Sequence, residues 1–374
     1  MAEVSKTRER GFTLIEMMIA LALGVLVVGA AVDLFSRGMN ASWLVSQRAE
    51  MQQDVRAASN FMRQDISMAG AGLPVGGVAL PAGSGTPIYG CDQNKCYIGN
   101  TASPAGIAFP NNFIYGVIPG YQLGTTINAA KGPTDIITVA YVDYSLLSNC
   151  YNVTFNNSNG TQATFSLPGT PLPGCSAPPP PVLSNSANGL TAGDLLLFTS
   201  NVGGNTAYAV GEVTQNVTGS AAPYTVNLVS PDALGINQPG ATSGDTKQIV
   251  AGTGTTAVRL LLISYYINVL PDPLGAGAGV PRLMRQVSGH TPVPLAENIA
   301  DMHFTYDTYD TSGNLLNNTG DGGLSVGVSP GLIRNVNITH LTIRGQLRGT
   351  TGYQGFDLQT AVSTRNMAFQ NRYQ

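Results

Sequence analysis

The chain has 374 residues, a formal net charge of -3 and only 10% charged residues, whereas an average soluble domain carries about 25%. A surface so poor in lysine and arginine does not suit duplex nucleic acid, which needs a basic face, so no nucleic-acid partner is indicated. The 43% hydrophobic content and the low net charge argue against global disorder. This composition, with 45 glycines and 23 prolines, is common in β-rich proteins outside the cytoplasm.

The charged residues are concentrated near the N-terminus, where the composition also differs. Residues 1–70 hold 14 of the 39 charged residues and no proline, and glycine and proline recur every few residues thereafter. A proline-free stretch that ends at a Gly/Pro cluster predicts one long helix over residues 12–70. Such a helix far exceeds the mean of about 11–12 residues in globular proteins, so part of it must lie in lipid or against like helices.

The first part of this helix, residues 12–32, is apolar apart from Glu16. At about 1.5 Å per residue it spans roughly 31 Å, enough to cross the apolar core of a bilayer. Lys6, Arg8 and Arg10 precede it, which favours a single-pass segment with a cytoplasmic N-terminus. An ordinary secretory signal is the alternative, but this apolar run is longer than a signal core of about 7–15 residues.

The second part of the helix carries a stripe of apolar residues on one face. The stripe advances by three or four residues at a time and consists of Met51, Val55, Ala58, Met62, Ile66 and Ala69. This spacing predicts that one face of the helix packs on a globular head. The charged residues between the stripe positions, among them Arg63 and Asp65, are expected on the solvated face.

Glu16 stands inside the apolar part, where a carboxylate is costly and needs a partner. Thr13 and Glu16 fit the capping box, in which two side chains satisfy the free amides of a helix start. Alternatively, cleavage after Gly11 would give Phe12 a new α-amine, and Glu16 of one subunit could neutralise that amine on a neighbour. Both interpretations stay open at this point.

The run Arg10-Gly11-Phe12-Thr13-Leu14-Ile15-Glu16 resembles the prepilin motif of type IV pilins and type II secretion pseudopilins. The resemblance implies that residues 1–11 are a leader peptide and that a prepilin peptidase cleaves between Gly11 and Phe12. It also implies that Phe12 is N-methylated and that Glu16 sets the axial register and recruits subunits during assembly.

Six further segments resemble PilW-type minor pilins and follow the order typical of them. They are residues 62–70, 259–267, 281–285, 294–306, 338–344 and 361–366. The resemblance implies an α+β, type IV pilin-like fold in which a long N-terminal helix carries a β-rich globular head. It also implies a minor pilin of a type IV pilus, or fimbrium, that primes assembly, lies near the tip and serves twitching motility and cell adhesion.

The same resemblance implies partners and a location. The partners would be other minor and major pilins, the prepilin peptidase and the inner-membrane assembly platform. The protein would reside in the inner membrane before assembly and in the extracellular pilus afterwards.

Two alternatives remain open. A J-type pseudopilin of a type II secretion system shares the prepilin motif, and only a phenotype, twitching or secretion, separates it from a pilin. A secreted or membrane-anchored β-rich adhesin would use an ordinary signal. Its mature N-terminus would follow cleavage near Ala30 and Ala31, whereas a pilin-like protein begins at N-methyl-Phe12.

After residue 70 the sequence predicts a β-rich head over residues 71–374. β-branched and alternating stretches predict strands at residues 135–142, 152–155, 163–167, 194–200, 207–214, 224–228, 257–268, 332–345 and 356–368. Residues 295–300 are expected to form at most a helical turn. Residues 75–250 resemble no segment of the family and are expected to be a loop-rich insertion with small strands.

Four cysteines follow the membrane segment and therefore face an oxidising compartment, where an even number favours disulfides. Of the three connectivities that four cysteines allow, the sequence-local one is preferred, which pairs Cys91 with Cys96 and Cys150 with Cys175. A metal site is the rival interpretation, but no C-x-x-C pair or nearby histidine supports it.

The sequence holds no Walker, dinucleotide-binding or H-E-x-x-H motif, and its three histidines, at positions 290, 303 and 340, stand far apart. Residues 327–331 match G-x-S-x-G, but Pro330 lacks the backbone amide that an oxyanion hole would use there. We therefore expect no enzymatic activity and no cofactor.

One oxygen-rich loop is a weak candidate for a metal. It contains Asp307, Asp310 and Asp321, which could hold Ca²⁺. A polar hairpin loop rich in Asx turns explains the same residues without a metal.

Overall fold

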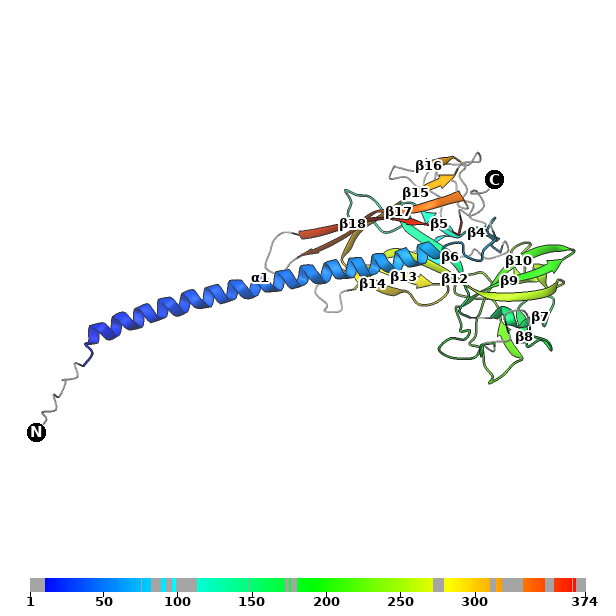
Figure 1. Cartoon of the computed structure of the whole chain (residues 1–374), viewed down its shortest axis with the longest axis horizontal. Coiled ribbons are helices and arrows are strands. Elements are labelled where there is room, and N and C mark those ends of the chain that lie inside the picture. Colours follow the sequence, from blue (N-terminus) through cyan, green and yellow to red (C-terminus); the bar gives the residue numbers. More distant parts are fainter. Residues whose placement is uncertain are drawn as a thin grey trace, which may run out of the picture. The chain divides into compact units, whose positions relative to one another are not determined.

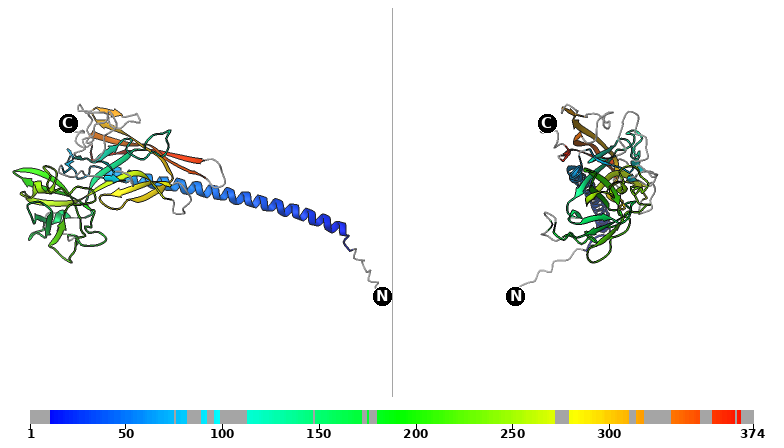
Figure 2. Two further views of the ribbon diagram at one scale, coloured as in Figure 1. Left: turned by 180° about the vertical axis from the view of Figure 1, so that it is seen from behind. Right: turned by 90° about the vertical axis from the view of Figure 1, so that its right-hand side faces the viewer.

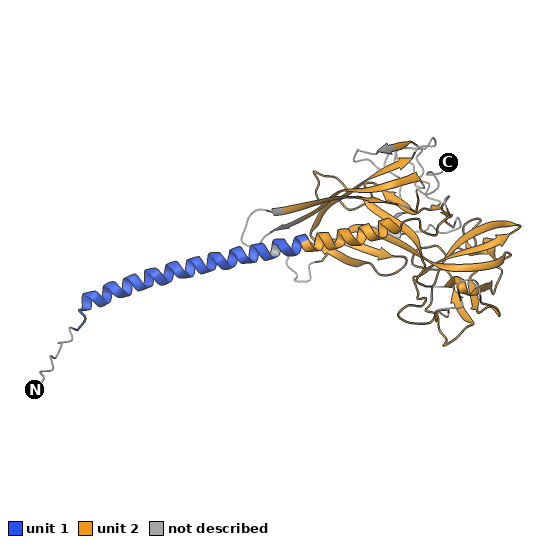
Figure 3. Ribbon diagram, viewed as in Figure 1, with its two compact units in different colours: residues 1–52, 345–354 blue, residues 53–344, 355–374 orange. Residues whose placement is uncertain are grey.

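The computed structural model describes residues 11–367 with several gaps. The residues outside the description within that span are 75, 82–88, 92–95, 99–112, 147, 172–174, 176–179, 272–278, 310–313, 318–331, 347–352 and 365. The chain divides into two compact units, shown in different colours in Figure 3. One comprises residues 1–52 with 345–354, and the other comprises residues 53–344 with 355–374.

The long helix expected from the sequence is present as α1, which runs from Leu14 to Met68 over 55 residues (Figure 1). Its sequence is rich in alanine, leucine and methionine, which are among the best helix formers, and holds no proline. The helix ends before Gly70, whose φ of +80° is the left-handed conformation that closes many helices. The amide of Gly70 then donates to the carbonyl of Ala140 at 2.8 Å. A long N-terminal helix followed by a β-rich region confirms the α+β fold class.

The apolar stripe of α1 is buried, as expected, in the part of the helix that belongs to the second unit. Its members each have an exposed fraction of 1% or less, and they are Val55, Ala58, Met62, Ile66 and Ala69. The expectation for Asp65 was wrong, because it is buried and not solvated, with an exposed fraction of 5%. Asp65 follows Met62 by three residues and precedes Ala69 by four, so it lies on the same helical face as the stripe.

A seven-stranded antiparallel sheet forms the centre of the second unit, in the order β10-β9-β12-β13-β14, with β6 on β12 and β5 on β6. Its longest strand is β12 (Thr253–Leu270). β12 pairs with β9 along Thr253–Leu260, with β6 along Arg259–Tyr265 and with β13 along Ile263–Leu270. The remaining strands are β5 (Val117–Gly120), β6 (Ile136–Asp143), β9 (Leu195–Val202), β10 (Asn205–Glu212), β13 (Val280–Val287) and β14 (Val293–Glu297).

Smaller sheets complete the β-rich region. A four-stranded sheet in the order β16-β15-β17-β18 consists of β15 (Ile299–Tyr309), β16 (Leu315–Asn317), β17 (Ile333–Gln346) and β18 (Tyr353–Ser363). A three-stranded sheet in the order β11-β8-β7 consists of β7 (Asn152–Phe155), β8 (Gln162–Ser166) and β11 (Tyr224–Asn227). Two-stranded pairs join β1 (Val78–Ala79) to β4 (Phe113–Ile114) and β2 (Tyr89–Cys91) to β3 (Cys96–Ile98). Two short 3-10 helices are η1 (Ser148–Cys150) and η2 (Thr246–Ile249).

Two hydrophobic cores lie on opposite faces of the central sheet. Along β9, Leu195 and Leu197 belong to one core, while Leu196 and Phe198 belong to the other. The second core also takes residues from β7, β8 and β11, so the three-stranded sheet packs on the central one as a β-sandwich. Figure 2 shows the ribbon from two further sides.

Residues 75–250 are therefore part of the central sheet of the head and not only a loop-rich insertion. Four of the seven strands of the central sheet lie in it, namely β5, β6, β9 and β10. β9 carries an unbroken apolar run whose side chains enter both cores. A strand buried on both faces carries such a run and not an alternating pattern.

The helical turn expected at residues 295–300 is not formed. β14 ends at Glu297 and β15 begins at Ile299. Asn298 between them has a φ of +59°, a left-handed conformation that asparagine adopts more readily than most residues. A single residue therefore makes the corner between two strands that belong to different sheets.

Cys150 and Cys175 form a disulfide across a sequence separation of 25 residues. Both are buried, with exposed fractions of 1% and 4%. Tyr151 next to the bridge donates its hydroxyl to the carbonyl of Pro181 at 2.6 Å, so two contacts fasten this segment to the second core. Cys91 and Cys96 stand opposite each other in the β2–β3 pair, but their side chains lie outside the description, and their pairing stays a prediction.

Replacing Cys150 and Cys175 together by alanine is expected to lower the free energy of unfolding by about 2–4 kcal/mol, because the bridge no longer restricts the unfolded chain. Urea unfolding of the wild-type chain and the double variant, each with and without reductant, measures this effect. Reductant should destabilise the wild type markedly more than the double variant. Equal sensitivity of both proteins to reductant would show that this bridge contributes nothing.

Candidate functional sites at the start and the end of the long helix

The start of α1 is closed by a capping box. Thr13 provides the carbonyl that accepts the first helical bond, from the amide of Met17 at 3.1 Å. Both the amide and the hydroxyl of Thr13 donate to Oε2 of Glu16 at 2.9 Å. In return, the amide of Glu16 donates to the Thr13 hydroxyl at 3.3 Å. The single chain thus forms the reciprocal arrangement that stabilises a helix start.

The helix surface around this box is apolar and exposed. Phe12, Leu14 and Leu21 have exposed fractions of 88%, 78% and 68%. Within the described part of the chain, α1 is also the one helix that is long and apolar enough to cross a membrane. A continuous apolar surface of this kind requires lipid or other apolar helices to cover it. Glu16 is the one charged group within that stretch, so it can act as a specific contact there.

Gly11 is exposed, and nothing in the folded chain requires it to be glycine. A Cβ atom added to it would meet no atom within 4 Å. Gly70 and Gly116 differ, since a Cβ on either would come within 3.0 Å of other atoms. The identity of Gly11 therefore has no explanation in the packing of this chain.

The opposite end of the helix is held by a buried polar network around Asp65. The carboxylate accepts hydrogen bonds from the hydroxyl of Tyr141 at 3.0 Å and from Nε of Arg285 at 2.9 Å. It also accepts a short bond from the hydroxyl of Tyr265. The three donors lie on β6, β12 and β13, so one helical side chain fastens α1 to three neighbouring strands.

Burial and charge fix the protonation states in this network. Burial, followed by the negative charge of Asp65, raises the pKa of both Tyr141 and Tyr265 well above the ordinary value, so both hydroxyls remain donors. Burial alone would lower the pKa of Arg285, but its hydrogen bond to Asp65 and the charge of that carboxylate raise it instead. Tyr141 and Tyr265 therefore remain neutral donors, and Arg285 remains a cation.

The network also joins three segments that are separate in the sequence. Asp65 lies in residues 62–70, Tyr265 in residues 259–267 and Arg285 in residues 281–285. The sequence of each segment resembles minor pilins, but that resemblance assigns no function to these three side chains. Their common role in the structure is to hold the end of α1 on the central sheet.

A second polar cluster links the central sheet to the four-stranded sheet. His303 on β15 contacts Asp301 at 2.9 Å through Nε2 and Asp135 at 3.4 Å through Nδ1. Asp135, just before β6, also accepts from the amides of Gln122 and Phe304 at 2.8 and 2.9 Å. The close carboxylates of Asp135 and Asp301 outweigh burial and raise the pKa of His303 to about 10.

The His303 cluster predicts a loss of stability at alkaline pH. A histidine whose pKa is about 6.5 in the unfolded chain and about 10 in the folded chain contributes fully below pH 6.5. The contribution is lost as the pH rises through 10. We expect it to be at most about 5 kcal/mol, because each unit of difference in pKa between the folded and unfolded chain corresponds to about 1.4 kcal/mol.

Thermal unfolding of the wild-type chain and of a His303→Gln variant from pH 7 to pH 10.5 measures this contribution. The difference in stability should shrink towards alkaline pH, while titration of other groups cancels between the two proteins. A difference that stays constant up to pH 10.5 would contradict the assignment.

The other sequence candidates have ordinary surroundings. His290 contacts Asp194 at 3.0 Å and His340 contacts Asp357 at 2.9 Å, so each histidine has an acidic partner that sequence spacing did not indicate. Asp307 accepts from the side-chain amides of two asparagines on β17 at 2.9 and 3.2 Å. Asp310, Asp321 and residues 327–331 lie outside the described residues. Among the described residues, no group of three or more His, Cys, Asp or Glu side chains is arranged to hold a metal ion.

Comparisons with known proteins bear directly on the helix start. Residues 6–32 match the prokaryotic N-terminal methylation motif, a stretch that includes Gly11, Phe12 and Glu16. The motif and the exposed apolar helix support a pilin-type protein that is anchored in a membrane before assembly into a pilus.

A particular relative agrees with this class. The chain is similar to the pilin-like protein PilA3 of Thermus thermophilus, with 25% identity over 176 residues. The match covers 46% of this chain and 60% of the relative, so it spans less than two thirds of the relative's length. No solved structure matches the chain.

Proposed function

We propose that this protein is a PilW-type minor pilin that primes the assembly of a type IV pilus and lies near its tip. The observation that carries the proposal is the exposed apolar start of α1, which bears Gly11, Phe12 and Glu16 inside the methylation motif. The order of the six further segments that resemble minor pilins supports the finer assignment. The large β-rich head suits a subunit present in low copy, because only a few such heads need to be accommodated.

Processing would occur between Gly11 and Phe12. The exposed coil at residues 11–13 is accessible to a peptidase. The open surroundings of Gly11 fit a residue selected by a narrow protease subsite and not by packing. The basic residues Lys6 and Arg8 would keep the leader on the cytoplasmic side of the inner membrane, where the assembly platform and the other pilins collect the processed subunit.

Glu16 would have two roles, one in the single chain and one in the assembly. In the single chain its Oε2 atom accepts both donors of Thr13, which holds the carboxylate in place at the helix surface. In the assembly, the same exposed carboxylate would neutralise the α-amine of Phe12 on a neighbouring subunit. The capping box and the assembly contact are therefore compatible, because Thr13 positions the group that the neighbour needs.

Deletion of the gene, followed by complementation with a tagged copy, tests the proposal. Loss of twitching and of surface pili, with secretion of type II substrates intact, is expected, and the tagged protein should appear in the sheared pilus fraction. Loss of secretion with normal pili would instead show the J-type pseudopilin. A protein released into the medium without pili would show the β-rich adhesin.

A further inference from the structure

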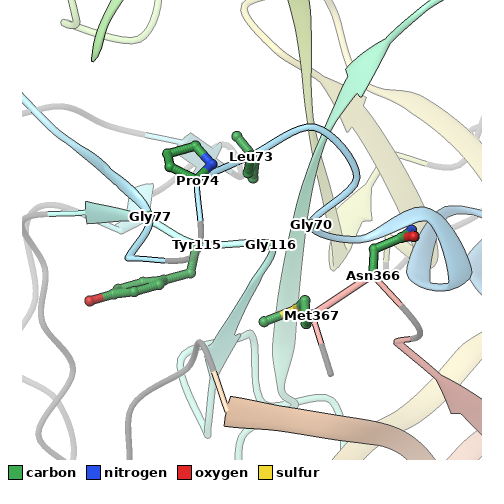
Figure 4. Close-up of a pocket in the computed structure, with 8 residues that line it drawn as sticks. All are labelled: Gly70, Leu73, Pro74, Gly77, Tyr115, Gly116, Asn366 and Met367. Atoms are coloured by element: carbon green, nitrogen blue, oxygen red, sulfur yellow. The ribbon is translucent and has the colours of Figure 1, made fainter. Parts of the chain in front are cut away.

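The last described residues of the chain, Thr364, Asn366 and Met367, form a C-terminal segment that lies over the end of α1. Met367 lies against the backbone of Gly70 and Gly116, as Figure 4 shows. A Cβ atom on Gly70 would stand 2.6 Å from Cγ of Met367, and one on Gly116 would stand 2.9 Å from its Sδ. Side chains at either position would displace the methionine, so these glycines form a cradle for it.

Two hydrogen bonds fasten the segment, one to the end of α1 and one to β17. The side-chain amide of Asn366 donates to the carbonyl of Met68 at 3.4 Å. The hydroxyl of Thr364 donates to the carbonyl of Ile333 at 2.8 Å. These residues connect the end of β18 with the C-terminal turn of α1. A cavity of about 30 Å³ lies there beside Met367.

We propose that Met367 is an oxidation site and that its conversion to the sulfoxide releases the C-terminal segment from the end of α1. A peroxide is the oxidant: the thioether sulfur takes one oxygen atom and loses two electrons, and the peroxide is reduced to water or an alcohol. Met367 is only partly exposed, but the adjoining cavity gives a small peroxide access to its sulfur.

Release follows from the hydrogen bonds around the cradle. A sulfoxide oxygen is a strong acceptor and needs a donor when it is enclosed. The amide of Gly70 already donates to Ala140, that of Leu73 to Gly70, and that of Gly77 to Pro74. A sulfoxide oxygen directed into the cradle would meet these three described amides already engaged, so movement of the side chain into water is favoured.

The other methionines of this unit do not share these properties. Met62, Met284 and Met302 are buried, with exposed fractions of 0%, 4% and 0%, so peroxide reaches them slowly. Met68 is 40% exposed, and its sulfoxide would remain in solvent without disturbing a contact. Met68 therefore serves as an internal marker of oxidation that leaves the segment in place.

The test uses the full chain purified in detergent and treated with hydrogen peroxide, with oxidation located by peptide mass spectrometry. Hydrogen exchange is then measured for peptides that cover the end of α1 and residues 353–367. Oxidation of Met367 should raise exchange there by a factor between about 5 and 30, the range for a loss of one or two kcal/mol. Reversal by methionine sulfoxide reductases should restore the slow exchange.

A Met367→Leu variant is the matched control, because leucine keeps the volume and cannot be oxidised in this way. After the same treatment its exchange should stay slow although Met68 is oxidised. Unchanged exchange in wild-type protein that carries the Met367 sulfoxide would overturn the proposal, as would oxidation of Met68 without any at Met367. The treated and untreated wild type decide the question even if the variant folds poorly.

Discussion

Replacing Asp65 by alanine is expected to lower the free energy of unfolding of the β-rich unit by about 3 kcal/mol. Breaking a buried ion pair costs roughly 3–5 kcal/mol, because the remaining charge is left without a partner. The lower end applies here, since the Arg285 side chain is 26% exposed and can recruit some water. Two tyrosine hydroxyls lose their acceptor in the same change.

Two further variants make this prediction specific. Gln64→Ala removes an exposed neighbour on the same helix and should change stability by no more than about 0.5 kcal/mol. Replacing Asp65 and Arg285 together by leucine should recover part of the loss, since an apolar pair can replace a buried ion pair. Urea unfolding measures all three, and an Asp65→Ala protein as stable as Gln64→Ala would refute the anchoring role.

Replacing Glu16 by alanine is expected to abolish incorporation into pili while leaving the head folded. The hydrogen bonds that the structure gives to the Glu16 side chain go to Thr13 alone, so the β-rich unit should keep its unfolding temperature. In the assembly, the α-amine of a neighbouring Phe12 would lie in an apolar layer without a partner. An unpaired charge in that layer costs about 2.5–3.5 kcal/mol, which corresponds to a loss of incorporation of about a hundredfold.

A Thr13→Val variant separates the two roles of Glu16. It removes the hydroxyl that completes the capping box and keeps the carboxylate. If the intersubunit charge matters, Thr13→Val should assemble almost normally and Glu16→Ala should not. Quantitative immunoblots of sheared pili give the measurement. Normal piliation with Glu16→Ala as the sole copy would refute the assembly role.

Local patterns in the sequence were enough to predict the helix, its membrane-length start and most strands. The stripe from Val55 to Ala69 has a 3.6-residue period, and Gly70 closes the helix by a conformation that glycine favours. A signal for the anchor was also present, because Asp65 falls on the apolar stripe and not between its members. An acidic residue at such a position indicates a buried partner, although the sequence does not say which one.

Contacts between residues far apart in the sequence could not be predicted from local patterns. Tyr265 and Arg285 lie 200 and 220 residues from Asp65, and no local pattern records that pairing. Strands were predicted within residues 75–250, but their pairing with β12 in the central sheet joins residues far apart in the sequence and leaves no local pattern. The corner at Asn298 was missed because its positive φ joins two strands without a glycine or proline.

The mature N-terminus shows whether the protein is processed as a prepilin. Intact-mass and N-terminal peptide mass spectrometry of the protein isolated from membranes or pili should show a chain that begins at Phe12 and carries one methyl group on its α-amine. This result requires cleavage after Gly11 within the motif that spans residues 6–32. A chain that begins after Ala30 or Ala31, or that retains Met1, would contradict processing as a prepilin.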